Sequence, residues 1–350
     1  MNRTAFIFLI AAVIVAVGLA LTLVDRPDEP TSGAGSAALL LPALSDRVNA
    51  VAALEIVGPE GETVASLQRS RERWRLRQKH DYEADFARIH QLLRDLAQAF
   101  RLEKKTGNPD WYGRLGVVSP GKAGADGVLV KFPDLDLPAV IIGHQDPAGL
   151  GRYVRLEGET HAWLIDRDID LPLERMEWLE RAIMDIPAAD IRSVTIRSAD
   201  GDEVELRSGN EPGSDWVMLD VPAGREVKPS WELAQTASVL ARLNMKDVRP
   251  ADSVPVPEDA VTTIFRTRDG LQFVARSFSD DRGHWVHFSV GEADASDNDT
   301  QTDGPDLDIV AVDGRLSPWQ FAITEERFER LRPTGGDLLL PPDEESTASE

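Results

Sequence analysis

The chain has 350 residues, 42% of them hydrophobic, which is long enough for two domains of ordinary size that each bury a core. Its 38 basic and 60 acidic residues give a formal net charge of −22, which argues against nucleic acid or an anionic membrane face as a partner. The chain contains no cysteine, which excludes disulfides, thiol nucleophiles, zinc fingers and iron–sulfur clusters.

Residues 4–24 are an uncharged and almost wholly apolar run, TAFIFLIAAVIVAVGLALTLV. A run of about 20 such residues matches the thickness of a bilayer core and predicts a transmembrane helix. A cleaved signal peptide is the alternative, because the small residues Gly18 and Ala20 could serve a peptidase. The apolar part of a signal peptide usually spans only about 7–15 residues, so the length favours a retained anchor in the bacterial inner membrane.

The charges that flank this run predict its orientation. Arg3 and the amino terminus precede it, whereas an acidic balance follows it between Asp25 and Glu29. By the positive-inside rule, residues 1–25 comprise a cytoplasmic start and the membrane span, and the rest of the chain is periplasmic. Residues 26–38, rich in Pro, Gly and Ser, then read as a flexible linker.

Comparison of the chain with itself predicts a duplication. An apolar strand containing Ile56, a turn, a second strand, a third strand with Trp74 and a helix follow one another in the first half. The same order recurs in the second half, where Ile196 and Trp216 take the equivalent places at nearly the same separation. Because a strand tryptophan that recurs in both halves is most simply a core anchor, we expect both tryptophans to be buried.

The predicted fold class is α+β: an N-terminal transmembrane helix, then two tandem repeats of a mostly antiparallel β-sheet unit with flanking helices. The first repeat spans residues 39–186 and ends in a joining helix over 171–186, which has apolar residues at helical spacing. The second spans residues 187–335 and carries an acidic disordered insert at about 291–308. Residues 336–350 are predicted to be a disordered acidic tail.

Three features resemble the bacterial family of the domain of unknown function 4340: the run MEWLERAIMDIPAADIRSVTI at 176–196, the motif NPDWYGRLGV at 108–117, and the tryptophan-containing third strand followed by a helix. The resemblance covers residues 48–335, and the acidic insert departs from the usual pattern. Members of that family have one amino-terminal span and a periplasmic region, and many are encoded beside ABC-transporter subunits of the kind associated with gliding motility. The resemblance therefore implies an accessory role beside such a transporter, and it carries over no catalytic residue.

Familiar chemical motifs are incomplete. The segment 116–123, GVVSPGKA, resembles a phosphate-binding loop, but Ala123 replaces the magnesium-binding Ser or Thr and the following residues do not predict a helix. Asp299, Asp303 and Gly304 fit part of a calcium loop whose last ligand position is occupied by Val310. The sequence therefore predicts no catalytic, cofactor-binding or metal-binding residue and no cofactor.

The leading hypothesis is a non-enzymatic, membrane-anchored periplasmic protein that contacts the inner membrane through residues 4–24 and binds components of an ABC-type transport or envelope assembly. A periplasmic module for a glycan or other polymer is the alternative, since aromatic rings can stack on sugar faces. Trp111, Tyr112 and Trp285 are the candidate interaction surface. A hydrolase is the third hypothesis and requires carboxylates and histidines to meet in one pocket.

Overall fold

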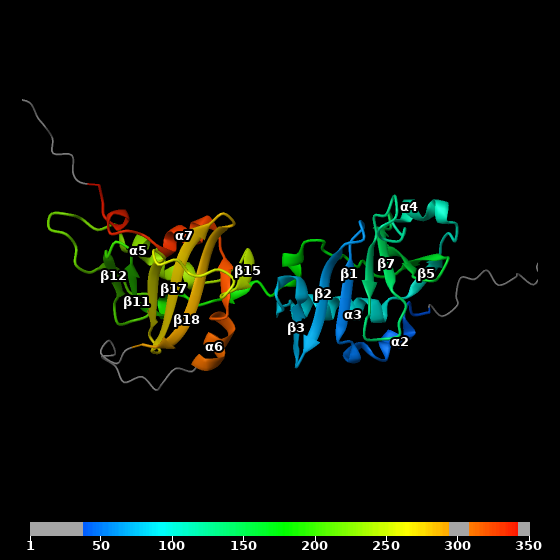
Figure 1. The fold of residues 1–350 in the computed structure, drawn as a ribbon, viewed down its shortest axis with the longest axis horizontal. Helices are drawn as coiled ribbons and strands as arrows, with labels where there is room; N and C mark the ends of the chain where they lie inside the picture. The colour runs from blue at the N-terminus through cyan, green and yellow to red at the C-terminus, as the bar shows by residue number, and fades with distance from the viewer. Residues whose placement is uncertain (1–37, 294–307, 342–350) are drawn as a thin grey trace, which may run out of the picture.

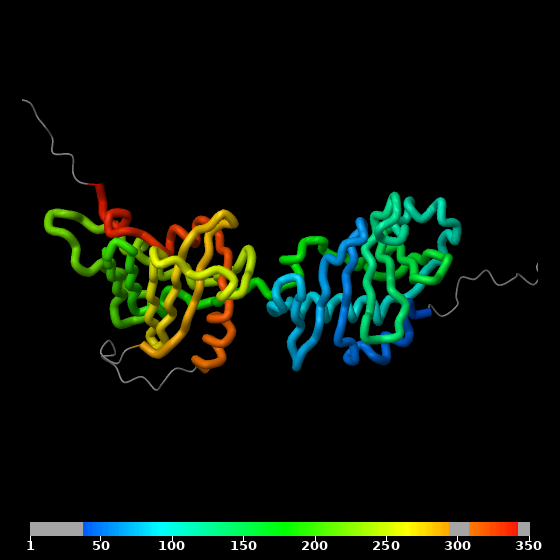
Figure 2. The backbone as a smooth tube through the Cα atoms, in the orientation of Figure 1, coloured from blue at the N-terminus to red at the C-terminus, as the bar shows by residue number. Residues whose placement is uncertain are grey.

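The computed structural model describes residues 38–293 and 308–341. These residues form three antiparallel sheets of nine, two and eight strands. Two lobes lie end to end with a narrow waist between them, as the ribbon and the backbone tube show (Figures 1 and 2). We call residues 38–180 the first unit and the described residues from 181 onward the second unit.

The first unit is built on the nine-stranded sheet, in the order β4-β3-β2-β1-β6-β7-β8-β9-β5. Its strands are β1 (Ala53–Val57), β2 (Thr63–Ser70), β3 (Arg73–Leu76), β4 (Tyr82–Glu83), β5 (Arg101–Lys104), β6 (Val128–Lys131), β7 (Val140–Gln145), β8 (Arg152–Leu156) and β9 (Ala162–Ile165). Its helices are α2 (Pro42–Ser45), α3 (Phe86–Gln98) and α4 (Tyr112–Leu115), with 3-10 turns η1 (Val48–Ala50), η2 (Arg77–Lys79), η3 (Pro109–Trp111) and η4 (Arg175–Trp178).

The second unit is built on the eight-stranded sheet, in the order β13-β12-β11-β16-β17-β18-β19-β15. Its strands, together with the two of the small sheet, are β10 (Ala182–Met184), β11 (Ile191–Arg197), β12 (Glu203–Ser208), β13 (Trp216–Met218), β14 (Leu243–Asn244), β15 (Asp247–Pro250), β16 (Val261–Thr267), β17 (Leu271–Asp280), β18 (Gly283–Glu292) and β19 (Trp319–Ala322). Its helices are α5 (Ser230–Ala237), α6 (Ile309–Leu316) and α7 (Glu325–Leu331), with 3-10 turns η5 (Ala188–Asp190), η6 (Ser238–Leu240) and η8 (Gly336–Leu338).

The two large sheets share one strand order. The first sheet contains the order β3-β2-β1-β6-β7-β8-β9-β5, and the second has the order β13-β12-β11-β16-β17-β18-β19-β15. In both, three strands lie in reverse chain order, the next four follow in chain order, and the strand that comes after the helix lies at the edge. Trp74 on β3 and Trp216 on β13 occupy equivalent places, and both are buried, with 3% and 6% of their surface exposed. Their predicted role as core anchors is confirmed.

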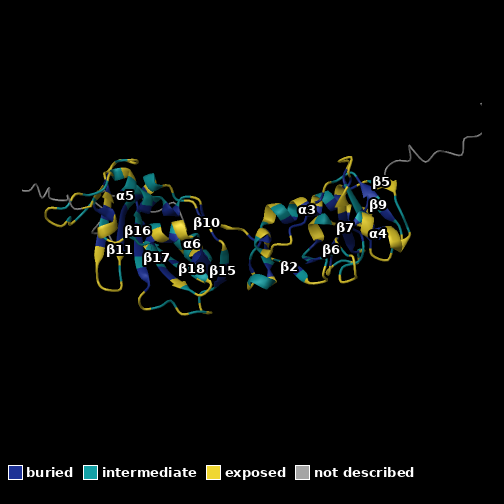
Figure 3. Ribbon diagram, turned by 90° about the horizontal axis from the view of Figure 1, so that it is seen from above, coloured by how far each residue is buried: buried dark blue, intermediate teal, exposed yellow. Residues whose placement is uncertain are grey.

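Alternating side chains give each sheet an apolar layer on both faces. On β7, Val140 and Ile142 join the main core beneath α3, whereas Ile141 joins a smaller cluster on the opposite face. The second sheet repeats this division, with Phe273 in the main core and Phe278 in a small cluster on the other face. Buried residues therefore run through the middle of both lobes beneath an exposed surface (Figure 3).

Helix α3 is the longest helix in the part of the chain that the structure describes, at 13 residues. Asp85 caps it, because its side chain accepts a hydrogen bond from the backbone N–H of Arg88 at 3.0 Å. Its buried residues recur at helical spacing: Ile89, Leu92, Leu93 and Leu96. This stripe covers one face of the first sheet.

The predicted α+β class is wrong, because the described residues are mostly β-sheet in three antiparallel sheets with a few short helices. The joining helix predicted over 171–186 is also wrong: η4 and the strand β10 occupy that segment. Leu179 in this segment pairs with Ala84 of the first unit, and β10 pairs with β14 of the second unit. Tertiary pairing therefore overrode the helical spacing.

The N-terminal transmembrane helix of that predicted fold is not found. Among residues 38–293 and 308–341, no helix is both long and apolar enough to cross a bilayer. The run 4–24 and most of the linker 26–38 lie outside the described residues. So do residues 294–307 of the insert and 342–350 of the tail, whereas residues 336–338 of the predicted tail form the turn η8.

One extended segment joins the units. The backbone N–H of Glu180 donates to the carbonyl of Glu83 at 3.1 Å and so extends the edge of the first unit. Strand β10 then pairs with β14 of the second unit. Arg181 lies between these two pairings, and its carbonyl accepts a hydrogen bond from Met245 at 2.9 Å. The two units are therefore coupled by one extended segment, residues 179–184, which we call the shared strand.

Candidate functional site

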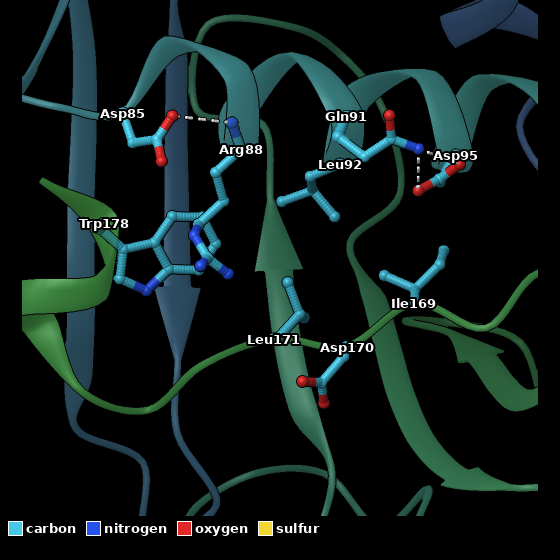
Figure 4. Close-up of a pocket in the computed structure, with 9 residues that line it drawn as sticks. All are labelled: Asp85, Arg88, Gln91, Leu92, Asp95, Ile169, Asp170, Leu171 and Trp178. Atoms are coloured by element: carbon cyan, nitrogen blue, oxygen red, sulfur yellow. Dashed lines mark hydrogen bonds between the residues drawn. The ribbon is translucent and has the colours of Figure 1, made fainter. Parts of the chain in front are cut away.

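A pocket of about 320 Å³ lies between α3 and the segment 169–171 of the first unit (Figure 4). Its lining residues are Asp85, Arg88, Gln91, Leu92, Asp95, Ile169, Asp170, Leu171 and Trp178. The buried side chains of Leu92, Leu171 and Trp178 make an apolar floor, and charged side chains form the rim. Such a floor and rim suit an apolar side chain of a binding partner.

The rim carboxylates are already engaged. Asp85 caps α3, and Asp95 accepts both of its hydrogen bonds from Gln91, at 2.9 and 2.8 Å. Asp170 pairs with Arg152 at 3.3 Å. Arg88 is 3.8 Å from Glu177, and its buried Nε has no hydrogen-bond partner. The pocket therefore offers an apolar floor, and its carboxylates are already committed to protein partners.

The sequence-predicted residues Trp111 and Tyr112 lie together at the junction of η3 and α4. Trp111 is 47% exposed, and the guanidinium of Arg114 lies 4.0 Å from the centre of its ring. Tyr112 is buried and points inward: its hydroxyl donates to the carbonyl of Thr160, and Arg155 lies 4.7 Å above its ring. Tyr112 thus anchors the turn that presents Trp111 and Arg114 to solvent.

The third predicted residue, Trp285, is only 3% exposed and lies on β18 of the second unit. The guanidinium of Arg249 lies 3.7 Å from the centre of its ring, and its Nε1 donates to Asp280 at 2.9 Å. Arg249 also donates to Asp280 at 2.7 Å and to Gln320 at 2.7 Å. We call Arg249, Asp280 and Trp285 the Arg249 cluster.

Two opposing effects set the pKa of Asp280. Burial opposes ionisation, but hydrogen bonds from Arg249, from the Arg282 backbone and from Trp285 outweigh it and hold the pKa below its usual value. Asp280 is therefore a carboxylate at neutral pH that is committed to holding Arg249 and Trp285. This geometry is that of a structural cluster on the outer face of the sheet.

The first unit carries an equivalent cluster, formed by Lys105, Asp146 and Tyr153. The Tyr153 hydroxyl donates to Asp146 at 2.6 Å, and Lys105 Nζ lies 5.8 Å from the centre of the ring. The hydrogen bond from Tyr153 lowers the pKa of Asp146, and the same bond raises the pKa of Tyr153 to about 12. The two units therefore share a cluster of a cation, an acid and an aromatic ring on the outer face of the sheet, as well as their strand order.

Strand register supports that equivalence. Tyr153 lies opposite Leu164 and Trp285 opposite Ala322. Lys105 directly follows β5 and bonds to Ala162 of β9, and Arg249 on β15 pairs with Gln320 of β19, so the two cations hold matching positions. The sequence pointed to Trp285 as a candidate interaction residue but did not identify Arg249, Asp280 or the equivalent cluster around Tyr153. Their signal is weak, since the two cations differ in type and the acids differ in placement: Asp146 follows β7, whereas Asp280 is the last residue of β17.

The structure does not bring the three predicted residues together. Trp111 and Tyr112 belong to the first unit and Trp285 to the second, so they share no groove. Among the residues that the structure describes, no group of three or more His, Asp or Glu side chains is placed to hold a metal ion. His284 stacks on Phe328 at 4.4 Å, and His287 contacts the Ser317 carbonyl at 2.9 Å, so both histidines of β18 have protein partners.

Three comparisons with known proteins complete these observations. A family model described as Domain of unknown function (DUF4340) matches residues 74–261, which is more than half of the chain. The match runs from β3 into β16 and so includes the shared strand and the waist. No curated protein and no solved structure matches the chain.

Proposed function

We propose, from the premise that the chain belongs to the DUF4340 family, that it is a non-enzymatic accessory protein which binds another protein through the turn that carries Trp111. In this proposal the apolar segment 4–24 holds the chain at the bacterial inner membrane with its remainder in the periplasm. Its partners are components of an ABC-type transport or envelope assembly.

The observation that carries the proposal is the pairing of an exposed tryptophan with a rigid support. Tryptophan and arginine are the side chains most enriched at the energetic centres of protein interfaces. Trp111 and Arg114 are exposed side by side, while the buried Tyr112 fixes the backbone beneath them. A pre-ordered aromatic side chain loses little entropy when a partner covers it.

A photo-crosslinking amino acid at position 111 of the full chain, in intact cells, tests this proposal. The expected result is an adduct with a transport or envelope component, identified by mass spectrometry. A matched probe at Glu258, an exposed residue of the second unit, should lack that adduct. Equal labelling from both positions, or no adduct from position 111, would contradict the proposal.

A second candidate function is glycan binding, and Trp231 supports it. This residue is 65% exposed beside a shallow depression of about 390 Å³ that includes Ser214, Asp215 and Ser230. An exposed indole flanked by hydroxyl and carboxylate groups suits a sugar ring. Titration of the full chain with soluble peptidoglycan fragments, followed by tryptophan fluorescence, tests it. A response that persists in Trp231→Ala would reject this site.

A further inference from the structure

The contact between the two units uses one surface from each. The donor surface is the tip of the first unit, where Lys79 and Tyr82 project. The receiving surface is the β15 side of the second unit. There Lys79 Nζ lies 2.5 Å from Asp247, and the Tyr82 ring meets Trp319 edge-on with 5.0 Å between ring centroids.

In each unit, the chain segment that enters the unit also pairs with its receiving surface. In the second unit the carbonyl of Arg181 accepts from the backbone N–H of Met245, and Ala182 pairs with Asn244. In the first unit the carbonyl of Ala38 accepts from Arg101, and the next residue, Leu39, pairs with Phe100. The same two interactions thus recur at the same places in both units.

The tips are equivalent in the same way. In the first unit the backbone N–H of Asp85 donates to the carbonyl of Trp178, and that of Glu180 donates to the carbonyl of Glu83. In the second unit Lys228 donates to the carbonyl of Leu338, and Leu340 donates to that of Glu226. The two units are therefore related head to tail along the long axis of the molecule.

Among residues 38–293 and 308–341, this relation leaves one receiving surface and one tip uncovered. Strand β5, the counterpart of β15, lies at the end of the first lobe away from the waist, while β12 and the red turn η8 lie at the far end of the second lobe (Figure 1). On β5 and beside it, Leu102 is 47% and Phe100 is 37% exposed. Asn244, the counterpart of Phe100, is polar. The uncovered receiving surface is thus the more apolar of the two.

We propose that the β5 surface of one chain binds the second-unit tip of another copy of the same chain, which repeats the internal contact between chains. The acid at this surface is Glu103, which pairs with Lys105 at 2.7 Å, keeps its side chain 61% exposed and occupies the register position of Asp247. The tip offers Arg225, which stands where Tyr82 stands in the first unit and whose guanidinium donates to the Leu340 carbonyl at 2.9 Å. A head-to-tail contact of this kind does not close on itself and produces linear assemblies.

The absence of cysteine from the chain makes a disulfide test unambiguous. Ala223 is an exposed residue of the second-unit tip, two positions before Arg225. The full chain in detergent, carrying Leu102→Cys with Ala223→Cys, should form a ladder of disulfide-linked dimers and larger species on oxidation. The pair Leu102→Cys with Glu258→Cys is the control, because both positions are exposed and Glu258 lies outside the tip. A ladder of equal strength from the control, or none from the test pair, overturns the proposal.

A charge exchange gives a second readout by sedimentation velocity. The unmodified chain should associate as its concentration rises, Glu103→Arg should reduce that association at least tenfold, and Glu103→Arg with Arg225→Glu should restore it. The proposal is overturned if the unmodified chain stays monomeric at all concentrations, or if neither substitution changes its association. Crosslinks from position 102 to a different protein, with no self-association, would assign the surface to that protein instead. None of these outcomes depends on the adduct expected from position 111.

Discussion

Tyr82 of the first unit lies edge-on against Trp319 of the second, with 5.0 Å between ring centroids and 85° between ring planes. This contact joins the two units at the waist, next to the ion pair of Lys79 with Asp247. Tyr82 is consequently only 5% exposed. The association of the two units therefore depends on aromatic packing as well as on the shared strand.

The burial of Tyr82 predicts loss of stability in alkali. Burial, opposed by Arg315 and reinforced by Glu83 and Glu180, raises its pKa from 10.0 to about 12. A raised folded-state pKa contributes stability that is complete below pH 10.0 and is lost as the pH rises through about 12. Urea unfolding across this range should show a smaller alkaline loss for Tyr82→Phe than for the unmodified chain. Tyr153 titrates in both proteins, so its contribution cancels in the comparison.

The Arg249 cluster predicts an acid-sensitive contribution. The lowered pKa of Asp280 contributes stability that is complete above the usual carboxyl pKa and is lost as the pH falls through the lowered value. Asp280→Asn should cost about 3 kcal/mol at neutral pH, because it leaves the buried Arg249 without its counter-charge. The acid loss should be correspondingly smaller in this variant. Asp281→Asn, at the exposed neighbour, is the control and should leave the unfolding curves unchanged.

The turn that presents Trp111 predicts a separation of stability from binding. Tyr112→Phe removes the hydrogen bond to Thr160 and should lower the free energy of unfolding by about 1 kcal/mol. Trp111→Ala removes an exposed side chain and should change that free energy by no more than about 0.5 kcal/mol. Urea unfolding measures both. A large destabilisation by Trp111→Ala would show that this residue supports the fold instead of a partner.

The C-terminal turn predicts where truncation becomes harmful. A chain that ends at Pro341 should unfold like the full chain, because η8 and the backbone pairs of Leu338 and Leu340 remain. A chain that ends at Thr334 loses the buried Leu338 and Leu339, each worth about 1.5–3 kcal/mol of burial, and should be destabilised by several kcal/mol. Thermal unfolding compares the two. Equal melting temperatures would show that the turn does not contribute to the core.

Some features could be predicted because they depend on short-range pattern. The alternation of apolar residues located the strands, and the recurrence of Trp74 and Trp216 identified two core positions. The motif at 108–117 included both Trp111 and Tyr112 but gave no means to tell that one is exposed and the other buried. That distinction depends on Thr160 and Arg155, which lie more than forty residues away in sequence.

By itself the sequence determined the strands, the duplicated order and the family, since each is written in local hydrophobic spacing and its repetition. Only the tertiary structure decided the strand in 171–186, the Arg249 cluster and the surfaces left uncovered. In each of these, a segment's conformation or a charge's location is set by partners from distant strands. A helical spacing of apolar residues cannot compete when both neighbouring units offer an open sheet edge to the same segment.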